Sequence, residues 1–258
     1  MTTKKTSIIP LSTLTIRDIK RFLRIWTQSL IPPMLTSILF ILIFGLSLGS
    51  RISGIEGVSY INFILPGLLM MGVIMSAYMA SSFSLFIQKF QGSIQELLVS
   101  PIAYWQIIAG ITIAAMVRSF MVALGILIVS ILFASVTIHN ILILLLFIIL
   151  VSMLFAFAGI ATALWANNFD QMSIFSTFLI TPLTYLGGVF YSINMLPAFW
   201  ATLARFNPIL YMIDGFRYGF IGISDVPVIY SFLVVLGLTM IFFSICVWMF
   251  KTGYKLRT

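Results

Sequence analysis

Side chains that commonly carry enzyme chemistry are scarce in this chain. The sequence has one histidine, His139, and one cysteine, Cys246, and none of the H-E-x-x-H, G-x-S-x-G or G-x-x-x-x-G-K-S/T patterns that build metal, nucleophile or phosphate sites. No acidic residue stands near His139 in the sequence, and a lone cysteine forms no intrachain disulfide and fits no metal spacing. We therefore expect no catalytic residue and no metal site in this chain.

One charged residue stands inside a long apolar run. Between Leu97 and Phe169, Arg118 is the single charged side chain among 73 residues, and such a charge costs ~2.5 to 3.5 kcal/mol at a bilayer centre. If a helix enters the membrane near Ile107, Arg118 lies eleven residues in, or about 16 Å deep, where it could meet an anionic substrate. If the helix enters later, the side chain can reach the cytoplasmic boundary. We favour this second, structural interpretation.

The elements that position these residues follow from composition. With 258 residues, 61% of them hydrophobic and 8% charged, and a mean hydropathy of +1.17, the chain is predicted to be one all-α membrane domain over residues 1–258. A spanning helix needs ~20 apolar residues. The charge-free windows predict six transmembrane helices, at about residues 31–48, 63–86, 107–134, 141–166, 174–191 and 229–248.

The net charge of +8 is interpreted as a topology signal. If both termini are cytoplasmic, the outer segments keep only Arg51, Arg205 and Arg217. The inner segments then hold ten basic residues, namely Lys4, Lys5, Arg17, Lys20, Arg21, Arg24, Lys89, Lys251, Lys255 and Arg257. We therefore predict cytoplasmic termini, and no nucleic-acid partner, since no soluble basic surface remains to hold a strand.

Two inner segments have the pattern of contact surfaces. Residues 14–26 are predicted to form an amphipathic helix. Its apolar face holds Ile16, Ile19, Leu23 and Trp26, and its basic face holds Arg17, Lys20, Arg21 and Arg24. Such a helix could lie on anionic lipid headgroups, dock a partner, or do both. In the loop that follows Lys89, a short helix can start at Gly92 and Ser93 and stop at Pro101. That helix is either a simple connector or a docking knob, because Glu96 stands beside Leu97, Leu98 and Val99.

Longer stretches resemble a known family. Four segments resemble ABC-2 type transporter permeases in order and spacing, and are close to the YadH-like permeases of bacterial inner membranes. They are RFLRIWTQSLIPP, YINFILPGLLMM, the loop QGSIQELLVSPIAYWQIIAG, and the stretch over 181–222 that begins TPLTYLGGVFYSINMLP. This resemblance covers nearly the whole chain. It implies a homodimeric, non-catalytic transmembrane subunit of an ATP-binding cassette exporter that pairs with two copies of a separate ATPase, which holds ATP and Mg.

The resemblance also implies roles for single residues. The amphipathic helix and the inner loop would seat on the ATPase through Arg17, Arg21, Arg24, Gly92, Glu96, Leu97, Leu98 and Pro101. Residues 194–217 would form an outer re-entrant helical hairpin, where Asp214 and Arg217 could pair at i and i+3. If that pair were exposed, it would be worth only ~0.2 to 0.5 kcal/mol.

The second and fifth spans would line the pathway by the same resemblance. Pro182 supplies a bend, Gly187 and Gly188 permit close helix contact, and hydroxyls without charge come from Tyr78, Ser82, Thr181 and Tyr185. An alternative is that the glycines form a packing notch, Pro182 is a static kink and the hydroxyls only bond neighbouring helices.

The function expected is outward transport of an amphipathic, lipid-linked, glycan-like or drug-like substrate across the bacterial inner membrane. The alternative is a stand-alone carrier or channel without an ATPase. Ion-coupled carriers usually keep carboxylates inside the membrane, and these spans hold none. A membrane-embedded enzyme is disfavoured because no catalytic constellation is present.

Overall fold

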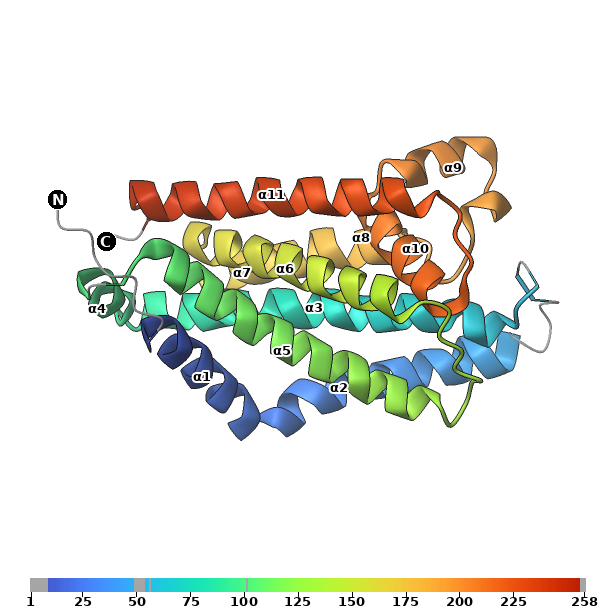
Figure 1. Cartoon of the computed structure of the whole chain (residues 1–258), viewed down its shortest axis with the longest axis horizontal. Helices are drawn as coiled ribbons and strands as arrows, with labels where there is room; N and C mark the ends of the chain where they lie inside the picture. The colour runs from blue at the N-terminus through green and yellow to red at the C-terminus, as the bar shows by residue number, and fades with distance from the viewer. Residues whose placement is uncertain (1–8, 49–53, 56, 101, 256–258) are drawn as a thin grey trace.

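The computed structural model describes residues 9–48, 54–55, 57–100 and 102–255; the side chains of 46–48 and 96–98 are also outside the described set. Within these ranges the regular structure is helical, apart from one isolated bridge between Ile55 and Val58. The predicted all-α class is therefore confirmed for the described residues (Figure 1).

Five helices in the described part of the chain are long and apolar enough to cross a membrane. They confirm five of the predicted spans as helices, although most extend beyond the predicted limits. The first is α2 (Trp26–Phe40), which continues into the π-helical segment η1 (Ile41–Leu48); the others are α3 (Tyr60–Phe90), α5 (Tyr104–Ser130), α6 (Ile141–Trp165) and α11 (Val228–Thr252).

The predicted span over 174–191 is interrupted. It is built from α7 (Phe169–Ile174), the π-helical η2 (Phe175–Ile180) and α8 (Thr181–Tyr185). Pro182 has no backbone N–H for the regular helical ladder, and the wider π-helical turns end just before it. The chain leaves the helix at Leu186, before the predicted end, and Gly188 takes a positive φ of +78° that suits glycine.

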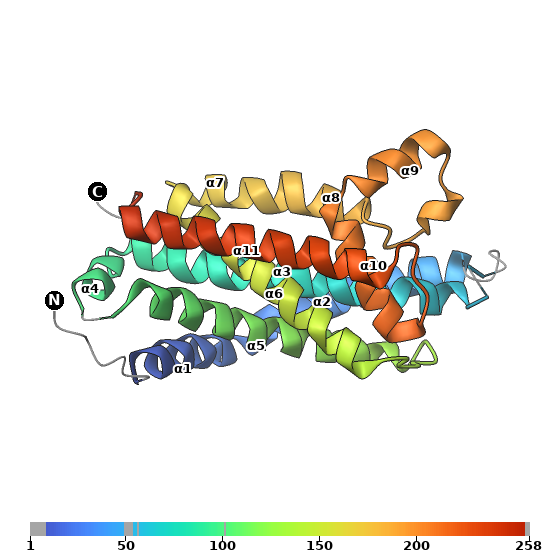
Figure 2. The ribbon, with the colours of Figure 1, turned by 45° about the horizontal axis from the view of Figure 1, so that its top comes forward.

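The segment predicted as an outer hairpin consists of two short helices joined by a turn. A 3-10 turn, η3 (Ile193–Met195), leads into α9 (Ala198–Arg205) and α10 (Pro208–Ile221). The side chain of Asn207 accepts a hydrogen bond from the backbone N–H of Ile209, which caps the start of α10. In Figure 2, α9 projects from one end of the molecule and α10 returns to the helical bundle.

Helix α3 lies at the centre and packs mainly against α5 and α6. At Gly159 of α6 the two backbones are very close, because a Cβ there would lie 2.6 Å from the carbonyl oxygen of Tyr78 and would overlap the hydroxyl of Ser81. A similar approach occurs at Gly219 of α10, where a Cβ would lie 2.7 Å from the backbone nitrogen of Leu144. Glycine permits both crossings because it lacks a side chain.

The amphipathic helix is longer than predicted; one of its faces packs on the helical bundle and another is exposed. Helix α1 (Ile9–Arg24) packs along α5 through the buried stripe Leu14, Asp18 and Phe22. The predicted apolar face is largely exposed, at Ile16, Leu23 and Trp26, and is therefore available to lipid. Figure 1 places the start of α1, the short helix α4 (Ile94–Val99) and the end of α11 at one end of the molecule, with α9 and α10 at the other.

Candidate functional site

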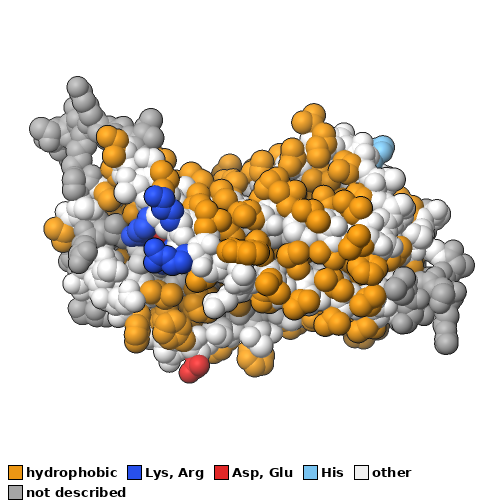
Figure 3. All heavy atoms as spheres, turned by 90° about the horizontal axis from the view of Figure 1, so that it is seen from below, with side chains coloured by type: hydrophobic (Ala, Val, Ile, Leu, Met, Phe, Trp, Pro, Cys, Tyr) orange, Lys and Arg blue, Asp and Glu red, His pale blue; other side chains and the backbone are white. Residues whose placement is uncertain are grey.

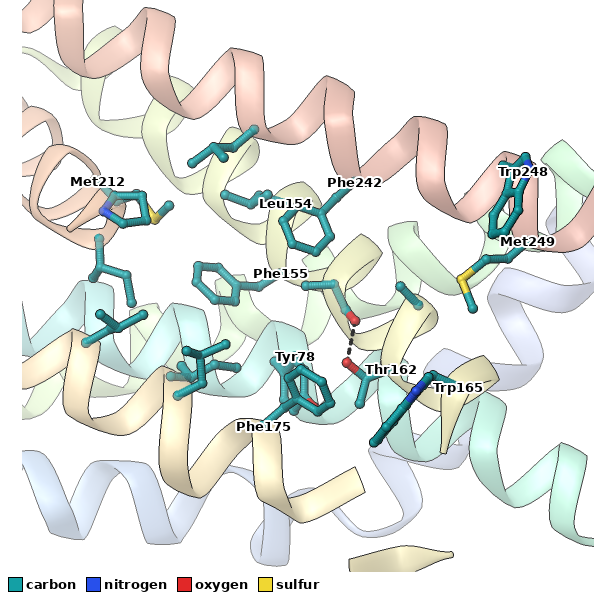
Figure 4. Close-up of a pocket in the computed structure, with 18 of the residues that line it drawn as sticks. Tyr78, Leu154, Phe155, Thr162, Trp165, Phe175, Met212, Phe242, Trp248 and Met249 are labelled. Atoms are coloured by element: carbon teal, nitrogen blue, oxygen red, sulfur yellow. Dashed lines mark hydrogen bonds between the residues drawn. The ribbon is translucent and has the colours of Figure 1, made fainter. Parts of the chain in front are cut away.

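A groove of about 450 Å³ runs between α6, α11 and the η2–α8 segment (Figure 4). Phenylalanine rings from three different elements, Phe155, Phe175 and Phe242, line its middle, and Trp165 and Trp248 lie at one end. Its described lining residues include no charged side chain. The groove therefore offers a hydrocarbon surface with aromatic groups at one end, as in many sites for apolar ligands.

Two of the hydroxyl groups that line the groove, those of Tyr78 and Thr162, already have protein partners. The Tyr78 hydroxyl donates to the carbonyl oxygen of Met172 at 3.2 Å, and the Thr162 hydroxyl donates to the carbonyl oxygen of Ala158 at 2.9 Å. Each hydroxyl oxygen can still accept a hydrogen bond. These two hydroxyl oxygens can therefore accept a hydrogen bond from a ligand, while their own O–H groups are already bonded to backbone carbonyls.

Beyond the tryptophan end, two lysines complete the last turn of α6. Lys89 Nζ donates to the carbonyl oxygens of Leu164 and Ala166 at 2.7 and 2.8 Å. Lys255 Nζ donates to the carbonyl oxygen of Trp165 at 2.8 Å and lies 5.6 Å from the centre of its ring. Cations at a helix C-terminus satisfy its free carbonyls and complement its dipole.

A buried ionic cluster holds the opposite end together. Arg217 Nη1 lies 4.0 Å from Asp214 Oδ1 and 3.8 Å from Asp225 Oδ2, and Arg217 Nη2 donates to the carbonyl oxygen of Gly188. Its guanidinium carbon lies 4.0 Å from the centre of the Phe63 ring. Asp214 and Arg217 are each only 1% exposed, so the pair is buried and the small contribution of an exposed pair does not apply to it. The segments that carry Phe63, Gly188 and Asp225 cover this pair and exclude water from it.

Both carboxylates of the cluster also accept backbone hydrogen bonds. Asp214 accepts from the N–H groups of Asp225 and Val226 at 2.7 and 3.1 Å, and Asp225 accepts from the Ser192 hydroxyl and from the N–H of Ile193 at 3.1 Å. Burial raises the pKa of Asp214 to about 6, against the opposing effects of the Asp225 N–H and the Arg217 charge. The cluster thus joins α10 to the turn after α8 and to the loop before α11.

The predicted pathway residues do not form one wall within this chain. Tyr78 lines the groove, whereas Ser82 is buried at the α3–α6 contact and Thr181 donates to the carbonyl oxygen of Ser176 at 2.8 Å. Tyr185 is 39% exposed. Pro182 is exposed, Gly187 packs against Ile209 of α10, and Gly188 supplies its carbonyl to the ionic cluster.

Of the predicted docking residues, those that the structure describes lie on α1 and in and before α4. Arg17 donates to Asp18 at 3.1 Å and to Gln88 of α3 at 3.0 Å, while Arg21 and Arg24 are exposed. Gly92, with a φ of +74°, lies in the turn before α4, which is helical as predicted. The side chains of Glu96, Leu97 and Leu98, and the whole of Pro101, lie outside the described residues.

Two acidic residues were missed by reasoning from sequence. Asp225 is one of them; it stands in a short loop with no motif around it. The other is Asp18, whose carboxylate accepts from the Ser84 hydroxyl of α3 at 2.7 Å and ties α1 to the bundle. A signal for Asp18 was present, because Leu14, Asp18 and Phe22 share a stripe at i, i+4 and i+8.

Comparison with known proteins identifies relatives along the chain. The model of the family described as ABC-2 type transporter matches residues 10–221. The chain is 43% identical over 250 residues to the inner membrane transport permease YadH of Escherichia coli (strain K12), covering 97% of this chain and 98% of that protein. It is 26% identical over 194 residues to nodulation protein J of Rhizobium leguminosarum bv. trifolii, covering 73% and 72% of the two chains.

Proposed function

Because the chain belongs to the ABC-2 type transporter family, we propose that it is the membrane-spanning half of an ABC exporter whose ATP hydrolysis takes place in a separate ATPase subunit. Membership makes the chain a membrane transport permease, and its apolar helices make it multi-pass. The sequence carries no phosphate-binding loop, which agrees with an ATPase on another chain that would hold ATP and Mg.

The groove is the observation that supports an amphipathic substrate. Its walls are apolar over their whole length, and the hydroxyl oxygens of Tyr78 and Thr162 offer hydrogen-bond acceptors between them. A cargo with a hydrocarbon part, such as a lipid-linked, glycan-like or drug-like amphiphile, would gain about 25 cal/mol for each Å² of apolar surface removed from water. A small inorganic ion would gain nothing from such walls.

We further propose that α7, η2 and α8 together form a sixth crossing and that both termini are cytoplasmic. Support comes from the arrangement in Figure 1, where the start of α1 and the end of α11 lie at the same end. Lys251, in the last turn of α11, is at this end, and the basic residues of α1 follow the start of that helix, as expected if positive charge gathers in inner segments.

The ATPase would dock at the α4 end, against the basic residues of α1 and the loop that carries α4. In the proposed complex Glu96 meets a basic groove on the soluble subunit. We expect Glu96→Lys to reduce the amount of ATPase that co-purifies with the permease in detergent by about tenfold, since a charge-assisted contact contributes roughly 1.5 to 3 kcal/mol. Pull-down of the tagged permease followed by quantification of the ATPase measures this.

The neighbouring exposed Gln95 provides a matched control, because Gln95→Lys adds a positive charge to the same helix without removing Glu96. It should retain most of the ATPase. Full recovery with Glu96→Lys, together with unchanged transport, would remove α4 from the interface and would favour a carrier that works without an ATPase.

The homodimer is proposed to form about α2 and α8. Leu35 and Leu39 of α2 are exposed, Tyr185 of α8 is 39% exposed, and the rings of Phe40 and Tyr185 lie 6.3 Å apart, so the two helices share one apolar outer face. In a Cys246→Ser background, Tyr185→Cys should give a crosslink between subunits that is lost when ATP is trapped. Crosslinking in membranes, read as a dimer band, tests this.

Tyr78→Cys is the internal control for that experiment. Tyr78 is 1% exposed and lies inside the subunit, so a cysteine there should not crosslink to a second copy. A dimer band from position 78 and none from position 185 would place the dimer axis on other helices.

A further inference from the structure

Arg118 has no counter-charge within the described part of the protein. It forms no ion pair there, and its Nε is buried without a hydrogen-bond partner. The contact it does make is with the ring of Phe22 in α1, whose centre lies 5.6 Å from the guanidinium carbon. A partly buried arginine that meets only an aromatic face still has donors that require an acceptor.

The charges around Arg118 make the imbalance larger. Arg21 lies close enough on α1 for its positive charge to act on Arg118. The acidic residue of α1, Asp18, accepts from Arg17 and from Ser84 and is directed to α3. Arg118 is therefore subject to the positive charge of Arg21 while the nearby carboxylate of Asp18 is engaged elsewhere, and this arrangement favours an anion beside the two arginines.

The position of these cations indicates where such an anion would come from. Figure 3 shows basic side chains gathered at the margin of a broad apolar surface. The exposed basic residues of α1 are followed directly by exposed Leu23 and Trp26, where α1 ends and α2 begins. Tryptophan is typical of the zone between headgroups and hydrocarbon. A molecule bound here would place its charge at the arginines and its apolar part on the adjoining surface.

We propose that Arg118 and Arg21 bind the phosphate of an anionic phospholipid in the leaflet on the α1 side of the membrane. Guanidinium groups bind phosphate oxygens through paired N–H donors, and a phosphate supplies the acceptors that Arg118 lacks. A lipid is favoured over a free phosphate because the apolar surface beside the arginines suits acyl chains. This site is separate from the groove between α6 and α11. It shares Arg21 with the proposed ATPase-docking face of α1, so its test uses the permease without the ATPase.

Native mass spectrometry of the full chain in mild detergent tests the site with phosphatidylglycerol as the probe. We expect the unmodified protein to retain phosphatidylglycerol in preference to phosphatidylcholine. Arg118→Gln and Arg21→Gln should each weaken that retention by about tenfold, since each removes one charge-assisted contact. Arg21 is exposed, so its replacement tests the site without disturbing a buried position.

Lys20→Gln is the matched control, because it removes the same charge from the neighbouring exposed position of α1. Retention close to that of the unmodified protein supports a specific site. An equal loss in Lys20→Gln would show general attraction to a basic surface and would overturn the proposal, as would full retention in both arginine variants. Replacement of the bound lipid by a phosphate adduct on addition of inorganic phosphate would identify a site for the free ion and overturn the lipid assignment.

Discussion

Arg217→Ala is expected to lower the free energy of unfolding by about 3 to 5 kcal/mol, because it removes one side of a buried ionic cluster. The carboxylates of Asp214 and Asp225 would remain beside the turn after α8 without their cation. The backbone hydrogen bonds that they accept compensate part of their charge, but not the loss of the guanidinium and its contact with Phe63. Thermal unfolding in detergent measures the loss.

The loss should depend on pH with a definite sign. Burial already raises the pKa of Asp214 to about 6, and without Arg217 that pKa would rise further. A carboxyl group whose pKa is raised by folding stabilises the protein below its unfolded pKa and loses this contribution as pH rises through its folded pKa. The deficit of Arg217→Ala relative to the unmodified protein should therefore be smaller at about pH 5 than at about pH 7.5.

Arg205→Ala provides the control, because Arg205 is exposed at the end of α9. Its effect should stay within about 0.5 kcal/mol. A deficit for Arg217→Ala that is absent, or that grows on acidification, would contradict the role of Arg217 as the counter-charge of the two carboxylates.

Gly159→Ala should also destabilise the protein, although alanine is the better helix former by about 1 kcal/mol. The added methyl group would overlap the hydroxyl of Ser81 and lie 2.6 Å from a backbone oxygen of α3, so α3 and α6 would have to separate. Overpacking of this kind commonly costs about 1 to 3 kcal/mol, and the backbone contact places this site at the upper limit. The midpoint of thermal unfolding should fall.

The same substitution at Gly237 gives the matched comparison. Gly237 lies within α11 and a Cβ there would have no neighbour within 4 Å, so Gly237→Ala should leave stability unchanged or raise it slightly. Equal unfolding midpoints for the two alanine variants would show that α3 and α6 tolerate a wider separation than the structure indicates.

The positions of most long helices could be predicted from the sequence because the cost of placing a charge in lipid is large and simple to count. Their ends could not. Helix α3 continues past its apolar stretch to Phe90, since Lys89 bonds carbonyls of α6 and does not mark the end of the helix. A charged residue ends a charge-free window, but its hydrogen bonds decide whether the helix ends there as well.

Local hydrogen bonding limited the prediction of the fifth span. Hydropathy carries no information about the number of residues in a helical turn. The π-helical turns before Pro182 and the end of the helix at Leu186 were therefore not predicted. Pro182 was expected to supply a bend, and it lies just after the π-helical turns end; Gly188, expected to permit close helix contact, takes a positive φ of +78° in the turn after α8.

The candidate site was only partly accessible from sequence. The pairing of Asp214 with Arg217 followed from their i, i+3 spacing, but their burial depends on Asp225 and on the turn after α8, which are distant in the chain. Of the residues that line the groove, only Tyr78 was named from the sequence as a pathway residue. Helix α6 is apolar over most of its surface, so its hydropathy does not indicate which face packs against α3 and which faces the space beside Phe242.

The contact between Lys255 and the end of α6 has a consequence for the order in which the protein is made. The carbonyl of Trp165 and the side chain of Asn167 emerge from the ribosome about ninety residues before the lysine that binds them. Helix α11, which carries one wall of the groove, is also synthesised last among the described helices. A nascent chain released into the membrane one helix at a time would therefore expose the open side of the groove to lipid until translation is nearly finished.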